Sequence, residues 1–296
     1  MKTRLSPSEI QALVEREVGP VSQLEQLAEG LASQAYGFWL GAAQYVVRVG
    51  RSADGYRKDA FAWHKFSSAA LPIPEVIRVD TLGEVSVCIS RRASGARITD
   101  VGDDLADLSS RVVDILAELG RTDTSPTTGF GSFDAQGKAP HQRWSEYLLN
   151  VSQPNFCDWS LIGDRSERRH VEAAIRMIEG LAPADPPGRG LIHGDFGAAN
   201  LISDGRTVTA IIDWDRAMIG DVAYDQANIF FWGEARLEAA RSILTHQHSG
   251  DHAWARRIRC YQLHICLQEL SESLTGLTPV DPGWLLARCA DLTEKA

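Results

Sequence analysis

The sequence lacks the features that mark several large classes of protein. Its five cysteines are odd in number and widely spaced, with no Cys-x-x-Cys pair, which fits reduced thiols better than a disulfide framework or a zinc site. No apolar run approaches the length that spans a bilayer. No apolar core follows Met1-Lys2-Thr3-Arg4, so we expect no signal peptide. We therefore predict a cytoplasmic protein that has no membrane partner.

Basic charge is also scarce. Lysine and arginine number 30 against 39 aspartates and glutamates, which gives a formal net charge of −9. Nucleic-acid binding needs clustered cations, so this balance argues against a nucleic-acid partner. A negative cleft can instead attract a cationic small molecule, although an acidic excess also keeps a protein soluble without any such ligand. Ordinary glycine, proline and charge contents predict a packed globule, which we expect to be monomeric.

The first ninety or so residues show strand patterns around one helix. Ser6-Pro7-Ser8-Glu9 has the form of a capping box and predicts an earlier helix that ends at Gly19-Pro20. Strands are expected over 23–27, 35–40, 44–49, 76–79 and 85–90, with a hairpin turn at Gly41-Ala42-Ala43. The inserted helix is expected over 58–68, before the Pro72 and Pro74 breaks.

The pattern changes after Ala93-Ser94-Gly95, which we interpret as a hinge. Helices are expected over 105–119 and 167–181, a β-rich island over 191–214, and a helical tail over 236–289. The predicted domains are an N-terminal lobe, 1–93, and a C-terminal lobe, 94–296. The expected fold class is α+β, with a β-rich first lobe and a mostly helical second lobe.

Two motifs in the β-rich island place oxygen-bearing side chains at the ends of apolar strands. The first runs from Leu191 to Asn200 and contains His193-Gly194-Asp195, and the second is Ile211-Ile212-Asp213-Trp214-Asp215. We expect Asp195, Asn200 and Asp213 to be offered to one place. Phosphoryl transfer needs such a set, because one carboxylate must accept the proton of the attacking hydroxyl while an amide and a second carboxylate hold magnesium on the phosphates.

This pattern resembles the motifs of aminoglycoside phosphotransferases, which have a bilobal protein-kinase-like fold. Further similarity to the members of that family that act on hygromycin B lies in 52–55, 69–76, 88–93, 129–131 and 227–232. The resemblance covers most of residues 21–232 and thins out in the C-terminal helices. It implies a phosphotransferase with an alcohol group as acceptor, which uses ATP, or alternatively GTP, together with Mg²⁺. The expected substrate is an aminoglycoside, hygromycin B, and its modification would confer antibiotic resistance.

The resemblance also implies roles for single residues. Asp195 would be the catalytic base or the group that orients the hydroxyl, and Asn200 and Asp213 would bind magnesium. His193 and Asp225 would brace the catalytic loop. The cofactor-binding residues would be the backbone of Arg91 and Ala93 at the adenine, and the loop over 30–36, with Ser33 and Gln34, at the phosphates.

The substrate contacts implied by the resemblance are Asp195, Phe196, Ala199, Trp232 and Glu269. Two of these have a second interpretation. Trp232 lies in an aromatic run that suits a helix core as well as a sugar pocket. Glu269 and Glu272 are one helical turn apart, so they suit ammonium groups or plain solvent exposure.

The sequence departs from the family at two places. The strand that should carry a phosphate-binding lysine reads Tyr45-Val46-Val47-Arg48-Val49, so Arg48 is the candidate there, and Lys58 on the following helix is the alternative, with Asp59 as its acidic neighbour. The hygromycin B-modifying members have an asparagine before the metal-binding asparagine, whereas this chain has Ala199.

Three other functions were considered. His193-x-Asp195 with a distant histidine could form the iron site of an oxygenase, with the third ligand among His246, His248, His252 and His264. That hypothesis leaves Asn200 and Asp213 unexplained. A degenerate kinase that only binds nucleotide is opposed by the complete catalytic set. A kinase of another small hydroxylated metabolite, such as an amino alcohol or a sugar, stays open.

Overall fold

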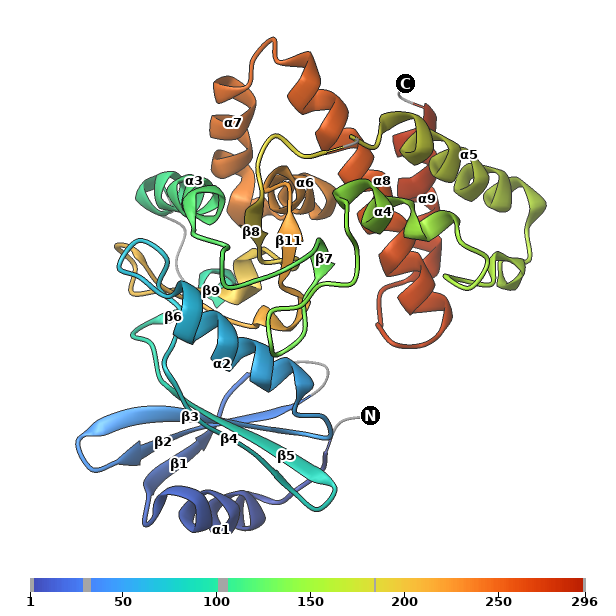
Figure 1. The fold of residues 1–296 in the computed structure, drawn as a ribbon. Helices are drawn as coiled ribbons and strands as arrows, with labels where there is room; N and C mark the ends of the chain where they lie inside the picture. Colours follow the sequence, from blue (N-terminus) through green and yellow to red (C-terminus); the bar gives the residue numbers. More distant parts are fainter. Residues whose placement is uncertain (1–2, 29–32, 101–105, 184, 295–296) are drawn as a thin grey trace. The chain divides into compact units, whose positions relative to one another are not determined.

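The structure, a computed structural model, describes residues 3–28, 33–100, 106–183 and 185–294 (Figure 1). It divides into two compact units. The first comprises Met1–Asp103, Asp134–Gly137 and Ala199–Arg216, and the second comprises Asp104–Phe133, Lys138–Ala198 and Ala217–Ala296. The first unit therefore includes two short segments that come from later in the chain.

The first unit is built on a five-stranded antiparallel sheet. Its strands are β1 (Ser22–Gln26), β2 (Gln34–Leu40), β3 (Ala43–Gly50), β4 (Val76–Leu82) and β5 (Val85–Arg91), in the order β1-β2-β3-β5-β4. The hairpin between β2 and β3 has the turn Gly41-Ala42, one residue shorter than predicted, because Ala43 already pairs with Leu40. Gly41 has φ 61°, a left-handed conformation that glycine adopts without a steric penalty.

Two helices lie on opposite faces of this sheet, α1 (Pro7–Val18) and α2 (Asp54–Phe66) (Figure 1). The capping box predicted for α1 is confirmed, since the Ser6 hydroxyl accepts from the Glu9 amide and the Glu9 carboxylate accepts from the Ser6 amide. Ile10 of α1 packs with the sheet residue Val47 in a buried core. Helix α2 begins four residues before the predicted start, and its N-cap residue carries no capping side chain that would mark that start in the sequence.

A second, three-stranded antiparallel sheet belongs to the same unit. It has the order β10-β9-β6, with β6 (Ala96–Arg97), β9 (Leu201–Ser203) and β10 (Val208–Ile211). The 3-10 turn η4 (Ala198–Asn200) precedes β9, and η5 (Trp214–Arg216) follows β10. Gly95 in the predicted hinge is required here, because a Cβ on it would lie 1.8 Å from the carbonyl oxygen of Ser203.

The second unit is mostly helical, as predicted. Its helices are α3 (Ala106–Arg121), α4 (Trp144–Leu148), α5 (Arg165–Leu181), α6 (Ala223–Trp232), α7 (Glu238–Gln247), α8 (His252–Leu274) and α9 (Pro282–Glu294). A small sheet, β7-β11-β8, joins β7 (Gly131–Ser132), β11 (Met218–Gly220) and β8 (Gly190–Ile192). Trp144, Tyr224 and Tyr261 are buried in the core of this unit, where Trp144 donates its indole N–H to the Tyr261 hydroxyl at 3.1 Å.

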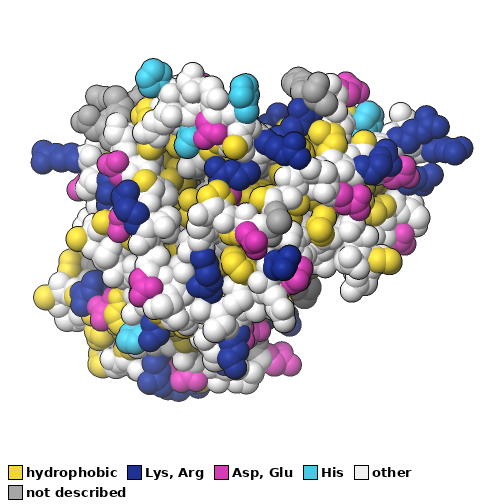
Figure 2. Space-filling view, turned by 45° about the horizontal axis from the view of Figure 1, so that its top comes forward, with side chains coloured by type: hydrophobic (Ala, Val, Ile, Leu, Met, Phe, Trp, Pro, Cys, Tyr) yellow, Lys and Arg dark blue, Asp and Glu magenta, His cyan; other side chains and the backbone are white. Residues whose placement is uncertain are grey.

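The surface of the described part of the chain agrees with the composition. On the face drawn in Figure 2, lysine and arginine side chains are interspersed with aspartate and glutamate rather than gathered together. Among the residues that the structure describes, no helix combines the length and the apolar character that a membrane crossing requires.

Candidate active site

Arg48 on β3 is the centre of a charged cluster in the first unit. Its guanidinium pairs with the carboxylate of Asp59 on α2, and its Nη1 lies 3.5 Å from Oδ1 of Asp213. Burial opposes the charge of Arg48, but the neighbouring carboxylates outweigh burial and raise the pKa of the guanidinium. Arg48 is thus a permanent cation next to one predicted magnesium ligand.

The predicted magnesium ligands Asn200 and Asp213 lie at the same end of the β9/β10 pair. Leu201 pairs with Ile211, and the amide of Ile212 donates to the carbonyl of Asn200 at 2.9 Å. Asp213 follows directly and has φ 69°, a left-handed conformation that is uncommon for any residue except glycine. Antiparallel pairing therefore brings together two residues that are thirteen positions apart.

Lys58, the alternative phosphate ligand, has a different partner from Arg48. Its Nζ donates to the backbone carbonyl of Asp215, and the residue is only 7% exposed. Burial lowers the pKa of Lys58 to about 8, against the opposing effect of the carboxylates of Asp215, Asp59 and Asp134. The structure therefore brings Arg48 into contact with the carboxylate of Asp213 and Lys58 into contact with the backbone of Asp215.

The residues predicted to hold the adenine and the phosphates lie around the sheet. The Arg91 amide donates to the carbonyl of Glu75 at 2.8 Å, so an adenine would have to use the carbonyl of Arg91. The side chain of Gln34 is buried and exchanges hydrogen bonds with the backbone of Leu5 at 2.8 and 2.9 Å. The side chain of Gln34 is therefore already hydrogen-bonded, so its backbone is the candidate for binding a phosphate. Residues 30–32 of the predicted loop lie outside the described residues.

The predicted base, Asp195, lies in the second unit on a loop whose backbone is hydrogen-bonded to Asp225 of α6. The buried carboxylate of Asp225 accepts the amides of His193 at 2.7 Å and Gly194 at 2.9 Å. The Asp195 amide donates to Nδ1 of His193 at 3.3 Å. Burial raises the pKa of Asp225 to about 6, and the imidazole of His193 and the two amides oppose that rise.

Two of the predicted substrate contacts, Phe196 and Ala199, have different environments. The Phe196 side chain is only 1% exposed and packs edge-on against His193, so this residue can offer a substrate little more than its backbone. Its carbonyl accepts from the side-chain amide of Asn228 at 3.2 Å. Ala199 is exposed, where a methyl group cannot hydrogen-bond a sugar.

Glu234, which the sequence reasoning did not single out, contacts the same loop. Its carboxylate accepts from the Ala198 amide, 3.2 Å from Oε2 and 3.4 Å from Oε1, and a Cβ on Gly197 would lie 2.7 Å from Oε1. Burial, together with repulsion from Asp195, raises the pKa of Glu234. The only sequence signal is a carboxylate directly after Gly233, the left-handed residue that ends α6.

The other predicted substrate residues lie on packed helices of the second unit. Trp232 is partly buried and stacks on Trp284, with ring centroids 5.5 Å apart and planes 2° from parallel. Glu269 on α8 is buried at 8% exposure, whereas Glu272 is partly buried. Plain solvent exposure is therefore not the state of either glutamate.

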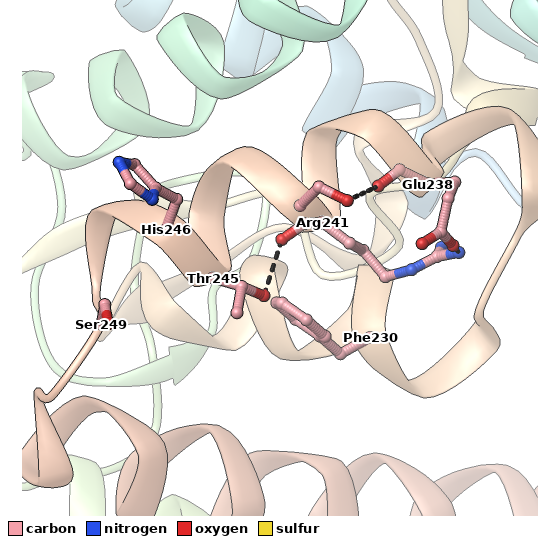
Figure 3. Close-up of a pocket in the computed structure, with 7 residues that line it drawn as sticks. Phe230, Glu238, Arg241, Thr245, His246 and Ser249 are labelled. Carbon is pink, nitrogen blue, oxygen red and sulfur yellow. Dashed lines mark hydrogen bonds and ion pairs between the residues drawn. The ribbon is translucent and has the colours of Figure 1, made fainter.

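A hollow of about 530 Å³ lies beside α7 (Figure 3). It is lined by Phe230, Glu238, Arg241, Ser242, Thr245, His246 and Ser249. The Ser242 and Thr245 hydroxyls donate back to carbonyls of their own helix, and Arg241 reaches out to the Glu234 carbonyl at 2.8 Å. No predicted site residue is among those that line this hollow; its residue Arg241 contacts Glu234, which in turn contacts the catalytic loop.

The oxygen ligands present suit magnesium better than a metal held by protein alone. Within the described ranges, no group of three or more histidine, cysteine, aspartate or glutamate side chains is arranged to hold a metal ion. Magnesium commonly uses one or two protein oxygens and completes its shell with phosphates and water. Asn200 and Asp213, at one end of the β9/β10 pair, fit that requirement.

A β-rich first unit and a mostly helical second unit are typical of kinase-like phosphotransferases, which act on a hydroxyl group. The chain belongs to the phosphotransferase enzyme family APH, whose family model matches residues 23–258. The predicted fold class and family are thereby confirmed.

Several proteins are similar to this chain over nearly all of its length. Hygromycin-B 4-O-kinase of Escherichia coli is 35% identical over 292 residues, which cover 97% of this chain and 85% of that protein. A crystal structure of aminoglycoside phosphotransferase APH(4)-Ia is 33% identical and has a TM-score of 0.90, with 98% of this chain and 99% of that chain covered. A thermostable mutant of APH(4)-Ia in a ternary complex with AMP-PNP and hygromycin B is 34% identical, with a TM-score of 0.90 and coverage of 97% and 98%.

A more distant structure has the same fold. The GDP complex of aminoglycoside 2'-phosphotransferase-IIIa is 16% identical to this chain, with a TM-score of 0.67 over 97% of this chain and 96% of that chain. At this identity, the likeness concerns the fold alone.

Proposed function

We propose that this protein is an ATP-dependent O-phosphotransferase of aminoglycoside antibiotics, with hygromycin B as its substrate, and that it confers resistance to that antibiotic. The observation that carries the proposal is the 35% identity to Hygromycin-B 4-O-kinase across 97% of the chain. Similarity of that extent includes the residues around the motifs as well as the motifs themselves. A net charge of −9 suits an acceptor that carries ammonium groups.

In the proposed reaction, Asp195 accepts the proton of a substrate hydroxyl. The hydroxyl oxygen forms a bond to the γ-phosphorus of ATP as the bond from that phosphorus to ADP breaks, and ADP leaves. Asn200 and Asp213 would hold magnesium, which neutralises charge on the phosphates when bound. Arg48 would add a second, fixed positive charge, an assignment supported by its contact with Asp213 at 3.5 Å. The His193–Asp225 hydrogen bond would keep the backbone of the Asp195 loop in one conformation.

Nucleotide binding is proposed for the predicted N-terminal lobe, 1–93. The carbonyl of Arg91 and the amide of Ala93 would meet the adenine edge, and backbone amides around Ser33 and Gln34 would meet the phosphates. ATP is the proposed donor, since a relative that is 34% identical is in complex with AMP-PNP, and GTP is the alternative.

Substrate binding is proposed for the predicted C-terminal lobe, 94–296. Trp232 would contact the sugar rings, and Glu269 would receive an ammonium group. At the catalytic loop, Asp195 would meet the reacting hydroxyl, and the backbone at Phe196 and Ala199 would contact its surroundings. The predicted monomeric state and cytoplasmic location accompany this proposal.

One observation favours the second candidate, a kinase of another small hydroxylated metabolite. Ala199 lacks a side chain that can hydrogen-bond a sugar at a position next to the proposed metal ligand Asn200. An acceptor with fewer hydroxyl groups on that side would lose nothing there. The substrate panel below therefore includes amino alcohols and sugars.

The test is a substrate panel with ATP and magnesium, read by mass spectrometry for a phosphate adduct. We expect an adduct on hygromycin B, and growth of a sensitive strain on hygromycin B when it expresses the protein. The Asp195→Asn variant is the matched control in both assays. Adducts on an amino alcohol or a sugar, with none on hygromycin B and no protection, would establish the second candidate instead.

A further inference from the structure

Gly55, Lys58 and Asp59 stand at positions i, i+3 and i+4 of α2 and therefore share one helical face. Each contacts the segment from Asp213 to Asp215. A Cβ on Gly55 would lie 2.9 Å from the Cβ of Asp215, so the helix approaches this segment as closely as a glycine permits. The segment from Asp213 to Asp215 is thus packed against one face of helix α2.

The two polar residues of this face bind the backbone of the segment. Oδ1 of Asp59 accepts the amide of Trp214 at 2.7 Å, and Nζ of Lys58 donates to the carbonyl of Asp215. One helix side chain thus satisfies a donor and the next satisfies an acceptor. Both bonds fall on the two residues that directly follow Asp213.

These two hydrogen bonds lie next to a residue with an unfavourable backbone conformation, Asp213. A left-handed aspartate costs free energy, and such a residue persists only where its surroundings determine its backbone. The bonds from Lys58 and Asp59 restrain the chain immediately after Asp213. Because the direction of the Asp213 carboxylate follows from its backbone, the same bonds restrain that direction.

We propose that Lys58 is a positioning residue that orients the magnesium ligand Asp213 through the carbonyl of Asp215, and that it is not a phosphate ligand. The inference rests on the magnesium role given to Asp213 under the proposed function. Two observations separate Lys58 from a phosphate ligand. It is 7% exposed, and the groups that face it are the carboxylates of Asp215, Asp59 and Asp134.

Lys58 also meets the other short segment that joins the first unit. Lys58 lines a cavity of about 240 Å³ together with Asp54 and Arg57 of α2 and with Asp134, Ala135 and Gln136. The cavity provides space for a side chain larger than lysine. An arginine at position 58 can therefore be accommodated and can still donate to the carbonyl of Asp215.

The experiment compares Lys58→Met, Lys58→Arg and the control Lys65→Met, which changes an exposed lysine on the same helix. Calorimetric titration measures the affinity for AMP-PNP without magnesium and over a series of magnesium concentrations. For Lys58→Met we expect the half-saturating magnesium concentration to rise about tenfold, as loss of one hydrogen bond to a charged donor implies. Affinity without magnesium should stay at the wild-type value.

Lys58→Arg should restore most of the magnesium response, and Lys65→Met should match the wild type. A thermal unfolding scan of each variant establishes whether it is folded. If Lys58→Met does not fold, Lys58→Arg is compared with the wild type: an unchanged magnesium response supports the inference, and AMP-PNP binding weakened by the same factor with and without magnesium contradicts it.

Two results would overturn the inference. The first is a magnesium response in folded Lys58→Met that equals the wild type. The second is weaker AMP-PNP binding by the same factor with and without magnesium, which would make Lys58 a direct phosphate ligand. None of the titrations contains hygromycin B, so the role of Lys58 can be tested even if the proposed substrate is wrong.

Discussion

The carboxylate of Glu234 accepts a hydrogen bond from the backbone amide of Ala198 at 3.2 Å. Ala198 lies three residues after Asp195 and two before Asn200, so the bond holds the stretch of chain that carries the proposed base and one proposed magnesium ligand. The backbone of Glu234 is itself restrained, since Arg241 donates a hydrogen bond to the Glu234 carbonyl at 2.8 Å.

Replacement of Glu234 should affect turnover more than nucleotide binding. We expect Glu234→Ala to lower kcat about tenfold, because the loop loses a hydrogen bond to a charged group. Glu234→Gln should retain most of the rate, since its amide oxygen can still accept from Ala198. Glu179→Ala is the control, as Glu179 is an exposed residue of α5. Equal losses in the alanine and glutamine variants would instead indicate that the negative charge itself contacts the substrate.

Asp195→Asn should remove catalysis and spare nucleotide binding. The substitution takes away the proton acceptor but leaves the side chain's size and the backbone bond to His193. We expect kcat to fall by about 10²- to 10⁴-fold, the range for loss of a general base, with unchanged affinity for magnesium and AMP-PNP. Asp204→Asn, at an exposed turn, should behave as the wild type in both measurements. A rate within threefold to tenfold of the wild type, on the order of 1 kcal/mol, would exclude Asp195 as the base.

Arg48→Ala should raise the KM for ATP and also destabilise the fold. Removal of the guanidinium leaves the buried carboxylate of Asp59 without its cation, which typically costs about 3 kcal/mol. Arg48→Lys should recover part of both losses, because an ammonium cannot span two carboxylates as a planar guanidinium does. Arg57→Ala, which breaks an exposed pair with Asp54, should change stability by less than about 1 kcal/mol. The two quantities are measured by steady-state kinetics and urea unfolding, and a silent Arg48→Ala would leave phosphate binding to the backbone and magnesium.

The stability of the fold should depend on the ionisation of Asp225. Its pKa is about 6 in the folded protein against an ordinary value of 3.8, so the folded state holds this proton more tightly than the unfolded state. The associated stabilisation is complete below about pH 4, declines as the pH rises to about 6, and is absent above that, with a total of about 3 kcal/mol.

A comparison of the wild type with Asp225→Asn isolates this effect, because asparagine does not titrate. Thermal midpoints measured from pH 4 to pH 7 should show the wild type losing stability relative to the variant as the pH rises. A difference that grows in favour of the wild type would mean that His193 and the two amides outweigh burial and lower the pKa.

Local sequence signals were sufficient for most of the secondary structure and for the order of the motifs. The capping box at Ser6 determines where α1 begins, because its two hydrogen bonds span only three residues. Apolar residues on both sides of Arg48 and the glycine at position 41 predicted the β2–β3 hairpin. The turn was misjudged by one residue, since register depends on pairing across the hairpin.

The sequence alone also determined the chemistry of the candidate site. The residue types and spacing of Asp195, Asn200 and Asp213 match what phosphoryl transfer requires, and these requirements come from the reaction and not from the packing. Resemblance over most of the chain then identified the family, which the family model confirms.

Only the tertiary structure decided which side chains support that site. Lys58 meets Asp215 across 157 positions, and Glu234 meets Ala198 across 36. No local propensity encodes such contacts, because they arise when helices α2 and α6 pack and bring distant backbone groups within hydrogen-bond distance. The contact between Arg48 and Asp213 likewise needed the fold, since strand pairing and helix packing, and not residue type, place the guanidinium of Arg48 beside Asp213.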